Sequence, residues 1–300
     1  MRDLAGKRAL VTGAASGIGR AIAHRLADER CDLFLLDIDG AGLAHTAAAL
    51  AASGVEVVTS RCDLADTASI DRAVDQAISR WAGVDLLVNN AGVTYYGHTH
   101  EMAAEHWDRL MAVNLLGPVH LTRALLPALL ARPEAHVLNV CSVLGLIGLP
   151  RVGAYCTSKF GLVGFSETLR AEYNRVGLGV TALCPGLAKT NLFAAAERRP
   201  GADAKTPPAA LCTTPERVAR AALRAIKRNQ AVARVEPFSR LLYAARQNFP
   251  TALDWLLQLG RRRRIERQRA HLQTLSADPV VALRKAGVEA ADKTQRRAAA

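Results

Sequence analysis

Short apolar runs of strand length recur along the first 236 residues and alternate with longer amphipathic segments. The runs lie at 8–12, 31–37, 55–61, 84–89, 136–141 and 179–184, with a seventh at 231–235. The segments between them repeat their apolar residues at helical spacing, as in 18–29, 66–82, 104–131 and 155–176. Near-continuous apolar strands that alternate with helices are typical of a parallel sheet covered on both faces. The pattern predicts a doubly wound α/β fold of about seven strands, which binds ligands at the carboxyl ends of its strands.

The last third of the chain departs from this alternation. Residues 197–210 (ERRPGADAKTPPAA) predict a surface loop, and a capped helix is expected to begin near Thr214. We place a domain boundary after Glu236, which separates an α/β domain (1–236) from a basic, helical C-terminal extension (237–300). The net charge is +12, and residues 261–300 alone hold eleven Lys or Arg against four Asp or Glu, a balance of +7. The body is therefore only mildly basic.

The extension admits several interpretations. Residues 237–264 mix Leu, Phe, Tyr and Trp with arginines at near-helical spacing and end in the run RRRR at 261–264. Such a segment can cover the binding cleft, form a subunit interface or lie on an anionic membrane surface. Nucleic-acid binding is not expected, because the basic run lacks interleaved stacking aromatics.

Composition narrows the class of protein. Half of the residues are apolar, which suffices for a large core, and no uninterrupted apolar run reaches the roughly 18 residues of a membrane span. No secretory signal is evident at the start. The six cysteines are scattered without a C-x-x-C pair, which predicts buried thiols in a reducing compartment and no metal site. We expect a cytoplasmic protein, with membrane contact confined to the basic extension.

The turn after the first strand is glycine-rich. Gly13, Gly17 and Gly19 stand between strand and helix, where glycines allow a tight turn and the helix amino terminus offers N–H groups to a pyrophosphate. A ligand-free glycine connector is the alternative. Asp37 ends the second strand about 20 residues later, where its carboxylate can accept hydrogen bonds from ribose hydroxyls and repel a 2′-phosphate. The sequence therefore favours NAD over NADP, although Arg30 and Arg61 are nearby.

Tyr155 and Lys159 stand four positions apart in a predicted helix, so both lie on one face. Taken alone, the pair is more typical of a half-exposed helix with a packed ring and a solvated amine.

Six short motifs, in order, resemble those of the short-chain dehydrogenase/reductase family, and the resemblance covers about residues 4–236. They are TGxxxGxG at 12–19, NNAG at 89–92, the helix asparagine Asn114, the strand-end serine Ser142, Y-x-x-x-K at 155–159, and PG at 185–186 with Thr190 beyond. The resemblance implies a Rossmann-type fold and a nicotinamide-dependent oxidoreductase.

The resemblance also implies roles for four catalytic residues. Tyr155 would exchange a proton with the substrate oxygen, Ser142 would hydrogen-bond the same oxygen, and Lys159 would bond the nicotinamide ribose. Lys159 and the oxidised nicotinamide would lower the pKa of the Tyr155 phenol. Asn114 would hold a water that links Lys159 to solvent. A helix asparagine bonded only to backbone is the alternative, which the other matches led us to set aside.

The cofactor-binding residues implied by the resemblance are Gly13, Ser16, Gly17, Ile18, Gly19, Asp37, Asp63, Leu64, Asn90, Ala91, Gly92, Tyr155, Lys159, Pro185, Gly186, Ala188 and Thr190. Asp63 and Leu64 would flank the adenine, and the Ala188 backbone would meet the carboxamide. Ala188 and Lys189 depart from the branched and acidic residues usual in the family, which weakens the preference for NAD.

The predicted substrate is an apolar secondary alcohol or ketone of steroid, retinoid, fatty or aromatic type. Segments 143–153 and 93–96, with Leu192 and Phe193, would line its pocket, and the Tyr95 and Tyr96 hydroxyls would orient it. These residues could instead only pack the loops. An NADP-dependent carbonyl or oxoacyl reductase is the alternative function. A non-catalytic cofactor sensor is disfavoured because the tyrosine and lysine are both kept. A homodimer or homotetramer is expected by analogy with the family.

Overall fold

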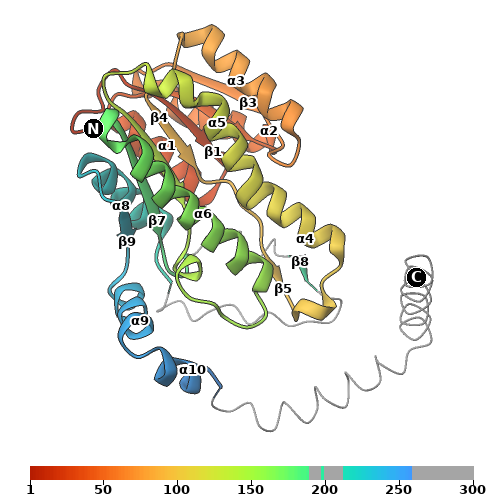
Figure 1. Ribbon diagram of the computed structural model, residues 1–300. Helices are drawn as coiled ribbons and strands as arrows, with labels where there is room; N and C mark the ends of the chain where they lie inside the picture. Colours follow the sequence, from red (N-terminus) through yellow and green to blue (C-terminus); the bar gives the residue numbers. More distant parts are fainter. Residues whose placement is uncertain (189–196, 199–211, 259–300) are drawn as a thin grey trace, which may run out of the picture. The chain divides into compact units, whose positions relative to one another are not determined.

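The computed structural model describes residues 1–188, 197–198 and 212–258, and the chain falls into two compact units, Met1–Tyr243 and Ala244–Ala300. The first unit holds a seven-stranded parallel sheet in the order β3-β2-β1-β4-β6-β7-β9 (Figure 1). The chain adds β2 and β3 on one side of β1 and then β4 and the later strands on the other side, so the topological switch point lies between β1 and β4. Its strands are β1 (Arg8–Thr12), β2 (Asp32–Asp37), β3 (Val57–Arg61), β4 (Leu86–Asn89), β6 (Ala135–Val140), β7 (Leu178–Cys184) and β9 (Val232–Arg234). The predicted doubly wound fold is confirmed, and each of the seven expected strands is present.

Helices cover both faces of this sheet. They are α1 (Gly17–Asp28), α2 (Gly40–Leu50), α3 (Thr67–Trp81), α4 (Ala104–Met111), α5 (Gly117–Leu130), α6 (Gly153–Tyr173) and α8 (Pro215–Lys227). Two further helices, α9 (Pro237–Asn248) and α10 (Pro250–Gln258), come next in the sequence. Short helical turns lie at η1 (Ala51–Ser53), η2 (Thr99–Glu101), η3 (Ala112–Leu116), η4 (Val143–Gly145) and η5 (Asn174–Val176). The Thr214 hydroxyl caps α8 by accepting from the Arg217 N–H, as the sequence predicts.

Alternation along the strands divides the core into two layers. Val11 and Leu35 pack on one face with α1 and α8, while Leu10 and Phe34 pack on the other with α3, α5 and α6. Successive side chains of a strand point to opposite faces, so a strand buried on both faces must be apolar throughout. The edge of the Phe34 ring meets Trp81 of α3 at 5.8 Å between ring centroids.

The predicted helix 104–131 is interrupted. A π-helical turn, η3, separates α4 from α5 and contains Asn114. Such turns are rare and often occur at functional sites. The whole stretch Ala104–Leu130 has the length and apolar composition of a membrane span. However, Leu121 and Leu125 of α5 are buried against the sheet, so this stretch is part of the core.

Two short strands were not expected from the sequence. β5 (Tyr95–Tyr96) and β8 (Glu197–Arg198) form a parallel two-stranded ladder. The prediction of a loop throughout 197–210 is therefore wrong at its first two residues, because β5 gives this segment a backbone partner. The remainder of that loop lies outside the described residues.

The first unit ends after Tyr243, whereas the sequence placed a boundary after Glu236. Ser239 is buried and bonded to Glu236, which explains why the first residues of α9 belong to the α/β unit.

Candidate active site

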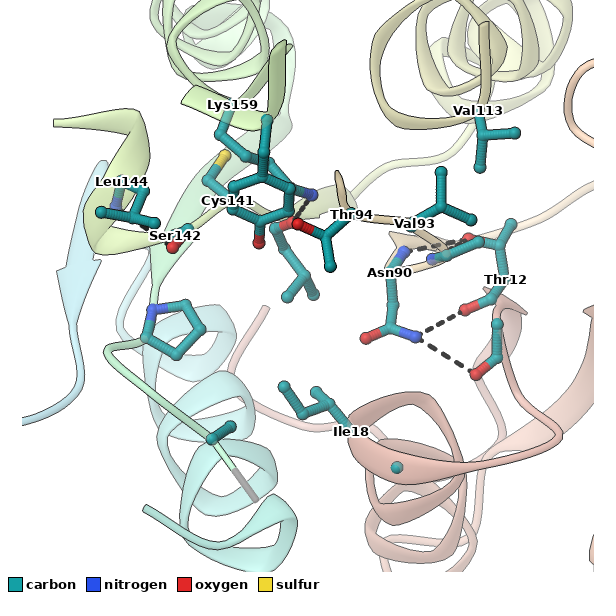
Figure 2. Close-up of a pocket in the computed structure, with 18 of the residues that line it drawn as sticks. Thr12, Ile18, Asn90, Val93, Thr94, Val113, Cys141, Ser142, Leu144 and Lys159 are labelled. Carbon is teal, nitrogen blue, oxygen red and sulfur yellow. Dashed lines mark hydrogen bonds between the residues drawn. The ribbon is translucent and has the colours of Figure 1, made fainter. Parts of the chain in front are cut away.

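A cavity of about 430 Å³ opens at the carboxyl ends of the central strands, and Figure 2 shows its lining. Most of the sequence-predicted residues line it: Gly13, Ser16, Gly17, Ile18, Asp37, Asp63, Leu64, Asn90, Ala91, Gly92, Ser142, Tyr155, Lys159, Pro185, Gly186 and Ala188. Gly19 and Asn114 lie behind this lining, and Thr190 lies outside the described residues. The sequence motifs therefore converge on one cavity.

The glycine turn is shaped by backbone conformation and close packing. Gly13 and Gly17 have φ values of +67° and +54°, in the left-handed region that favours glycine. A Cβ on Gly19 would overlap the Gly13 carbonyl oxygen and the Asn90 amide. Gly19 thus lets α1 approach the turn, and its place behind the cavity wall is a packing role.

Asn90 locks this turn to the end of β4. Its Nδ2 donates to the carbonyl oxygens of Thr12 and Gly13 at 3.0 and 3.2 Å (Figure 2). In return, the Thr12 hydroxyl accepts from the backbone N–H groups of Asn90 and Ala91. The Asn90 side chain therefore positions the turn from within the protein, in addition to lining the cavity.

The Asp37 carboxylate lies beside the glycine turn at the end of β2. Its two oxygens accept from the backbone N–H groups of Ala15 and Asp39 at 3.0 and 3.1 Å. Arg61 of β3 is in register with Asp37, but its Nε donates to the Ile38 carbonyl and the residue does not line the cavity. The Asp37 carboxylate is thus one of two acidic groups, with Asp63, that line this end of the cavity.

The other end of the cavity gathers the side chains of Ser142, Tyr155 and Lys159. All three are buried, from the end of β6 and from α6. The Lys159 ammonium lies 5.7 Å from the centroid of the Tyr155 ring and donates to the Val140 carbonyl at 2.9 Å. The Ser142 hydroxyl hydrogen-bonds the Tyr155 phenol and accepts from the Leu144 N–H. The residues that the motifs align are thus adjacent in space.

Burial dominates the electrostatics here. It raises the pKa of Tyr155 far above its usual range, although the hydrogen bond from Ser142 opposes the rise. Burial also lowers the pKa of Lys159. The sequence predicted a lowered pKa for Tyr155, and the protein alone moves it in the opposite direction. The Tyr155 phenol is therefore held protonated by its surroundings.

The Asn114 side chain is committed to the protein backbone. Its Oδ1 accepts from the Val93 N–H at 2.8 Å, and its Nδ2 donates to the Val93 carbonyl at 2.9 Å and to Ser158 Oγ at 3.2 Å. The backbone-bonded alternative, set aside in the sequence argument, describes these contacts. Asn114 thereby ties the π turn to the segment that follows β4.

The loop 185–188 is fastened from three directions. The Pro185 carbonyl accepts from the Val143 N–H at 2.8 Å, beside Ser142. The Gly186 N–H donates to Glu236 Oε2 at 2.7 Å, and the Leu187 carbonyl accepts from the Thr213 N–H. Sequence reasoning missed Glu236, which lines the cavity with Ser239 and Leu242. Its position directly after the last strand was the available signal, since ligand-contacting residues follow strands.

Apolar side chains line the mouth near Ser142 and Tyr155. They are Val93, Val113, Val143, Leu144, Leu149 and Leu242, with Thr94 and the exposed Arg109 as polar exceptions. The Tyr95 and Tyr96 hydroxyls, expected to orient a substrate, instead bond the Glu101 carbonyl and the Arg151 guanidinium, and neither residue lines the cavity. Leu192 and Phe193 lie outside the described residues.

Comparisons with known proteins agree with this geometry. A sequence profile described as short chain dehydrogenase matches residues 7–200. A protein named CLA biosynthesis dehydrogenase/reductase, of Lactiplantibacillus plantarum, is 34% identical over 67% of this chain and 71% of its own. A D-beta-hydroxybutyrate dehydrogenase of Cupriavidus necator is 35% identical over 63% and 73%.

A solved structure shares the fold. A short-chain dehydrogenase/reductase from Burkholderia phymatum, in complex with NAD, has a TM-score of 0.74 and 30% identity, covering 82% of this chain and 95% of its own. The chain belongs to the short-chain dehydrogenase/reductase family of nicotinamide-dependent oxidoreductases.

Proposed function

We propose that this protein interconverts an apolar secondary alcohol and its ketone by hydride transfer, with NAD preferred as cofactor. The observation that carries the proposal is the meeting of Ser142, Tyr155 and Lys159 at one end of a cavity whose other end is the glycine turn. A dinucleotide has a phosphate-rich middle between two nucleosides, and this cavity offers a complementary arrangement.

The residues present fit a nicotinamide dinucleotide. Gly13 and Gly17 carry no side chain, so a ligand can approach the backbone at the amino terminus of α1, where N–H groups attract phosphate. Asp37 and Asp63 line the adenosine end. The Asp37 carboxylate favours ribose hydroxyls over a 2′-phosphate, which supports NAD.

In the proposed reaction the bound nicotinamide supplies the hydride acceptor or donor. Tyr155 takes the proton from the substrate hydroxyl, or returns it, at its phenolic oxygen. Ser142 donates a hydrogen bond to the same substrate oxygen and steadies its developing charge. The Lys159 ammonium favours the phenolate, an effect that must offset part of the rise in the pKa of Tyr155 caused by burial. Asn114 is a positioning residue that fixes Val93 at the cavity wall.

The apolar mouth supports a hydrophobic substrate. Val143, Leu144 and Leu242 offer surface to rings or acyl chains, whereas few side chains there could satisfy the hydroxyls of a sugar. Two relatives are named for CLA biosynthesis and for D-beta-hydroxybutyrate, and these names support an acyl-type alcohol as the substrate.

A single assay tests the proposal. Steroid, retinoid, fatty and aromatic alcohols and ketones are supplied with NAD or NADH, and turnover is followed at the nicotinamide absorbance, with Tyr155→Phe as the control. We expect turnover of hydrophobic compounds by the wild type and almost none by the variant. Ready turnover of sugars with none of the hydrophobic compounds would overturn the substrate class.

An NADP-dependent reductase is the second candidate. It is favoured by Arg61, whose position in register with Asp37 puts a guanidinium near the adenosine end. Fluorescence titration with NADH and NADPH distinguishes the two, and tighter binding of NADPH would establish the alternative.

We propose membrane-surface contact for the second unit. Phe249, Trp255 and Leu256 are exposed, and the run 261–264 follows in the sequence. Exposed aromatic and leucine side chains beside arginines suit an anionic bilayer surface. Sedimentation with phosphatidylserine-containing and neutral vesicles, for the full chain and a truncation at Leu259, tests this; equal recovery of both proteins in the supernatant would refute it.

We also propose a homo-oligomer in a reducing, cytoplasmic setting. Leu116 and Phe160 are exposed on helical surfaces of the first unit, which is typical of a covered interface. No disulfide joins the six cysteines, all of which are among the described residues. Light scattering of the purified chain measures the assembly, and a monomer at all concentrations would exclude it.

A further inference from the structure

Glu236 places a carboxylate in the wall of the cavity, between β9 and α9. Its Oε2 accepts hydrogen bonds from the Gly186 N–H at 2.7 Å and from the Ser239 hydroxyl at 3.0 Å. Its Oε1 is buried without a hydrogen-bond partner. A buried carboxylate with one oxygen unsatisfied keeps much of its field, because neither water nor a donor offsets it.

No basic side chain among the described residues forms an ion pair with this carboxylate. Arg234, two residues earlier, instead holds its guanidinium over the Tyr243 ring, 4.6 Å from the ring centroid. Within the described part of the chain, the charge of this carboxylate is therefore offset only by its two hydrogen bonds.

This charge lies at the reaction end of the cavity. Glu236 is bonded to Gly186, and the adjacent Pro185 carbonyl accepts from Val143, the residue after Ser142. An alcohol loses its hydride from a carbon and its proton from the oxygen bonded to that carbon. The nicotinamide ring must therefore lie near Ser142 and Tyr155. Glu236 consequently lies closer to the nicotinamide end of the cavity than to the adenosine end.

Among the described residues, five charged ones line the cavity: Asp37, Asp63, Arg109, Lys159 and Glu236. The two aspartates are at the adenosine end, and Arg109 is exposed to solvent, which screens it. At the reaction end, the described charges are the buried Lys159 ammonium and the half-buried Glu236, whose Oε1 is shielded from solvent. The two have opposite effects on a cation placed near them.

The oxidised nicotinamide ring carries a positive charge that the reduced ring lacks. We propose that Glu236 is a specificity-determining residue whose carboxylate makes this site prefer the oxidised over the reduced nicotinamide. The inference rests on the proposed function, since it assumes a nicotinamide at this end of the cavity. In this arrangement Lys159 favours the phenolate, and Glu236 offsets the repulsion between the Lys159 ammonium and the oxidised ring. The enzyme then binds the oxidised dinucleotide more tightly and releases the reduced one more readily.

The test compares affinities in the full-length protein. Glu236→Gln keeps the size of the side chain and an oxygen that can accept from Gly186, but removes the charge. The dissociation constant of NADH is measured by the fluorescence of the reduced ring, and that of NAD by its competition with NADH. We expect roughly tenfold weaker binding of NAD and little change for NADH, the size expected for one partly screened charge at short range.

Three further variants separate charge from architecture. Ser239→Ala loosens the bonding of Oε2 but keeps the charge, so both dissociation constants should move together. Glu236→Asp keeps the charge and should retain the wild-type preference for NAD over NADH. This variant also tests the proposal if Glu236→Gln fails to fold. Glu172→Gln, an exposed glutamate of α6, is the matched control and should change neither constant.

The outcomes distinguish this inference from the proposal on which it rests. If Glu236→Gln changes both constants by the same factor, or neither, the inference is overturned while the proposed function stands. The inference is also overturned if Glu236→Asp weakens NAD binding relative to NADH binding as much as the loss of charge is expected to do. If the wild-type protein binds neither dinucleotide, the proposed function fails and the inference falls with it.

Discussion

The two ends of the cavity are held in different ways. At the adenosine end, the turn bounded by Gly13 and Gly19 is fixed by backbone shape and by hydrogen bonds from Asn90. At the reaction end, Tyr155 and Lys159 are buried groups whose pKa values are displaced by desolvation. Steric fit therefore governs the first end, and electrostatics governs the second. Substitutions at the two ends should fail in different measurements.

The largest expected effect is at the reaction end. Tyr155→Phe removes the phenolic oxygen but keeps the ring, so kcat should fall by about 10³-fold, the usual contribution of a general acid or base. Dinucleotide affinity should stay near that of the wild type. Steady-state kinetics and fluorescence titration measure the two quantities, and a variant that keeps most of its kcat would exclude Tyr155 from proton transfer.

The same pair of proteins tests the pKa of Tyr155. Its pKa in the folded protein is raised, so the phenol adds stability below the unfolded value near 10, and this stability is lost as pH rises through the folded value. The tyrosinate difference absorbance between wild type and Tyr155→Phe should be absent up to about pH 10 without dinucleotide. Ionisation of Tyr155 in the neutral range under those conditions would contradict the effect of burial.

At the adenosine end, Gly19→Ala should disrupt the turn. The new methyl group would meet the Gly13 carbonyl oxygen and the Asn90 amide, and overpacking of this kind costs about 1–3 kcal/mol. We expect a lower free energy of unfolding and weak NAD binding. Gly164→Ala in α6 is the control, because nothing lies within 4 Å of its Cβ position, and it should stabilise the helix slightly. Equal behaviour of the two variants would refute the packing role of Gly19.

Asn114 ties the π turn to Val93 at the cavity wall, and its loss should reduce stability first. Asn114→Ala leaves the part-buried N–H and C=O of Val93 without their partner, at about 1 kcal/mol for each unsatisfied group. Urea unfolding measures the change. Asn248→Ala, an exposed asparagine of α9, should be nearly neutral. A fully stable Asn114→Ala with reduced kcat would instead favour the water-holding role predicted by the family resemblance.

The smallest expected effect is a change in cofactor preference. Asp37→Asn keeps an oxygen for the Ala15 N–H but removes the charge that repels a 2′-phosphate. The ratio of the NADP and NAD dissociation constants should fall by roughly tenfold. Asp75→Asn on the exposed side of α3 should leave the ratio unchanged, and the same result for Asp37→Asn would remove the basis for preferring NAD.

Local chemistry explains what could be predicted from the sequence. Strands buried on both faces must be apolar, so runs such as the one in β2 stand out. Glycines at fixed spacing, such as Gly13 and Gly17, predict a tight turn with positive φ angles from the local sequence alone. The adenosine end was therefore largely predictable.

Features that depend on distant partners were not predictable. The β5–β8 ladder needs two segments about 100 residues apart, and neither Tyr95 nor Glu197 signals the other. Glu236 follows a strand that the sequence did predict, but its hydrogen bonds to Gly186 and Ser239 depend on how distant segments fold together. The sequence predicted that Lys159 and the oxidised nicotinamide lower the pKa of Tyr155, but motif spacing could not report the opposing effect of burial.

The π turn at 112–116 is a place where the length of the chain can vary by one residue. A π-helical turn holds one residue more than an α-helical turn, so deleting one residue from it would restore regular winding and leave the helix downstream in nearly the same orientation. Leu121 and Leu125 would then still face the sheet. Homologous sequences with a single-residue gap at this place are therefore compatible with the same fold.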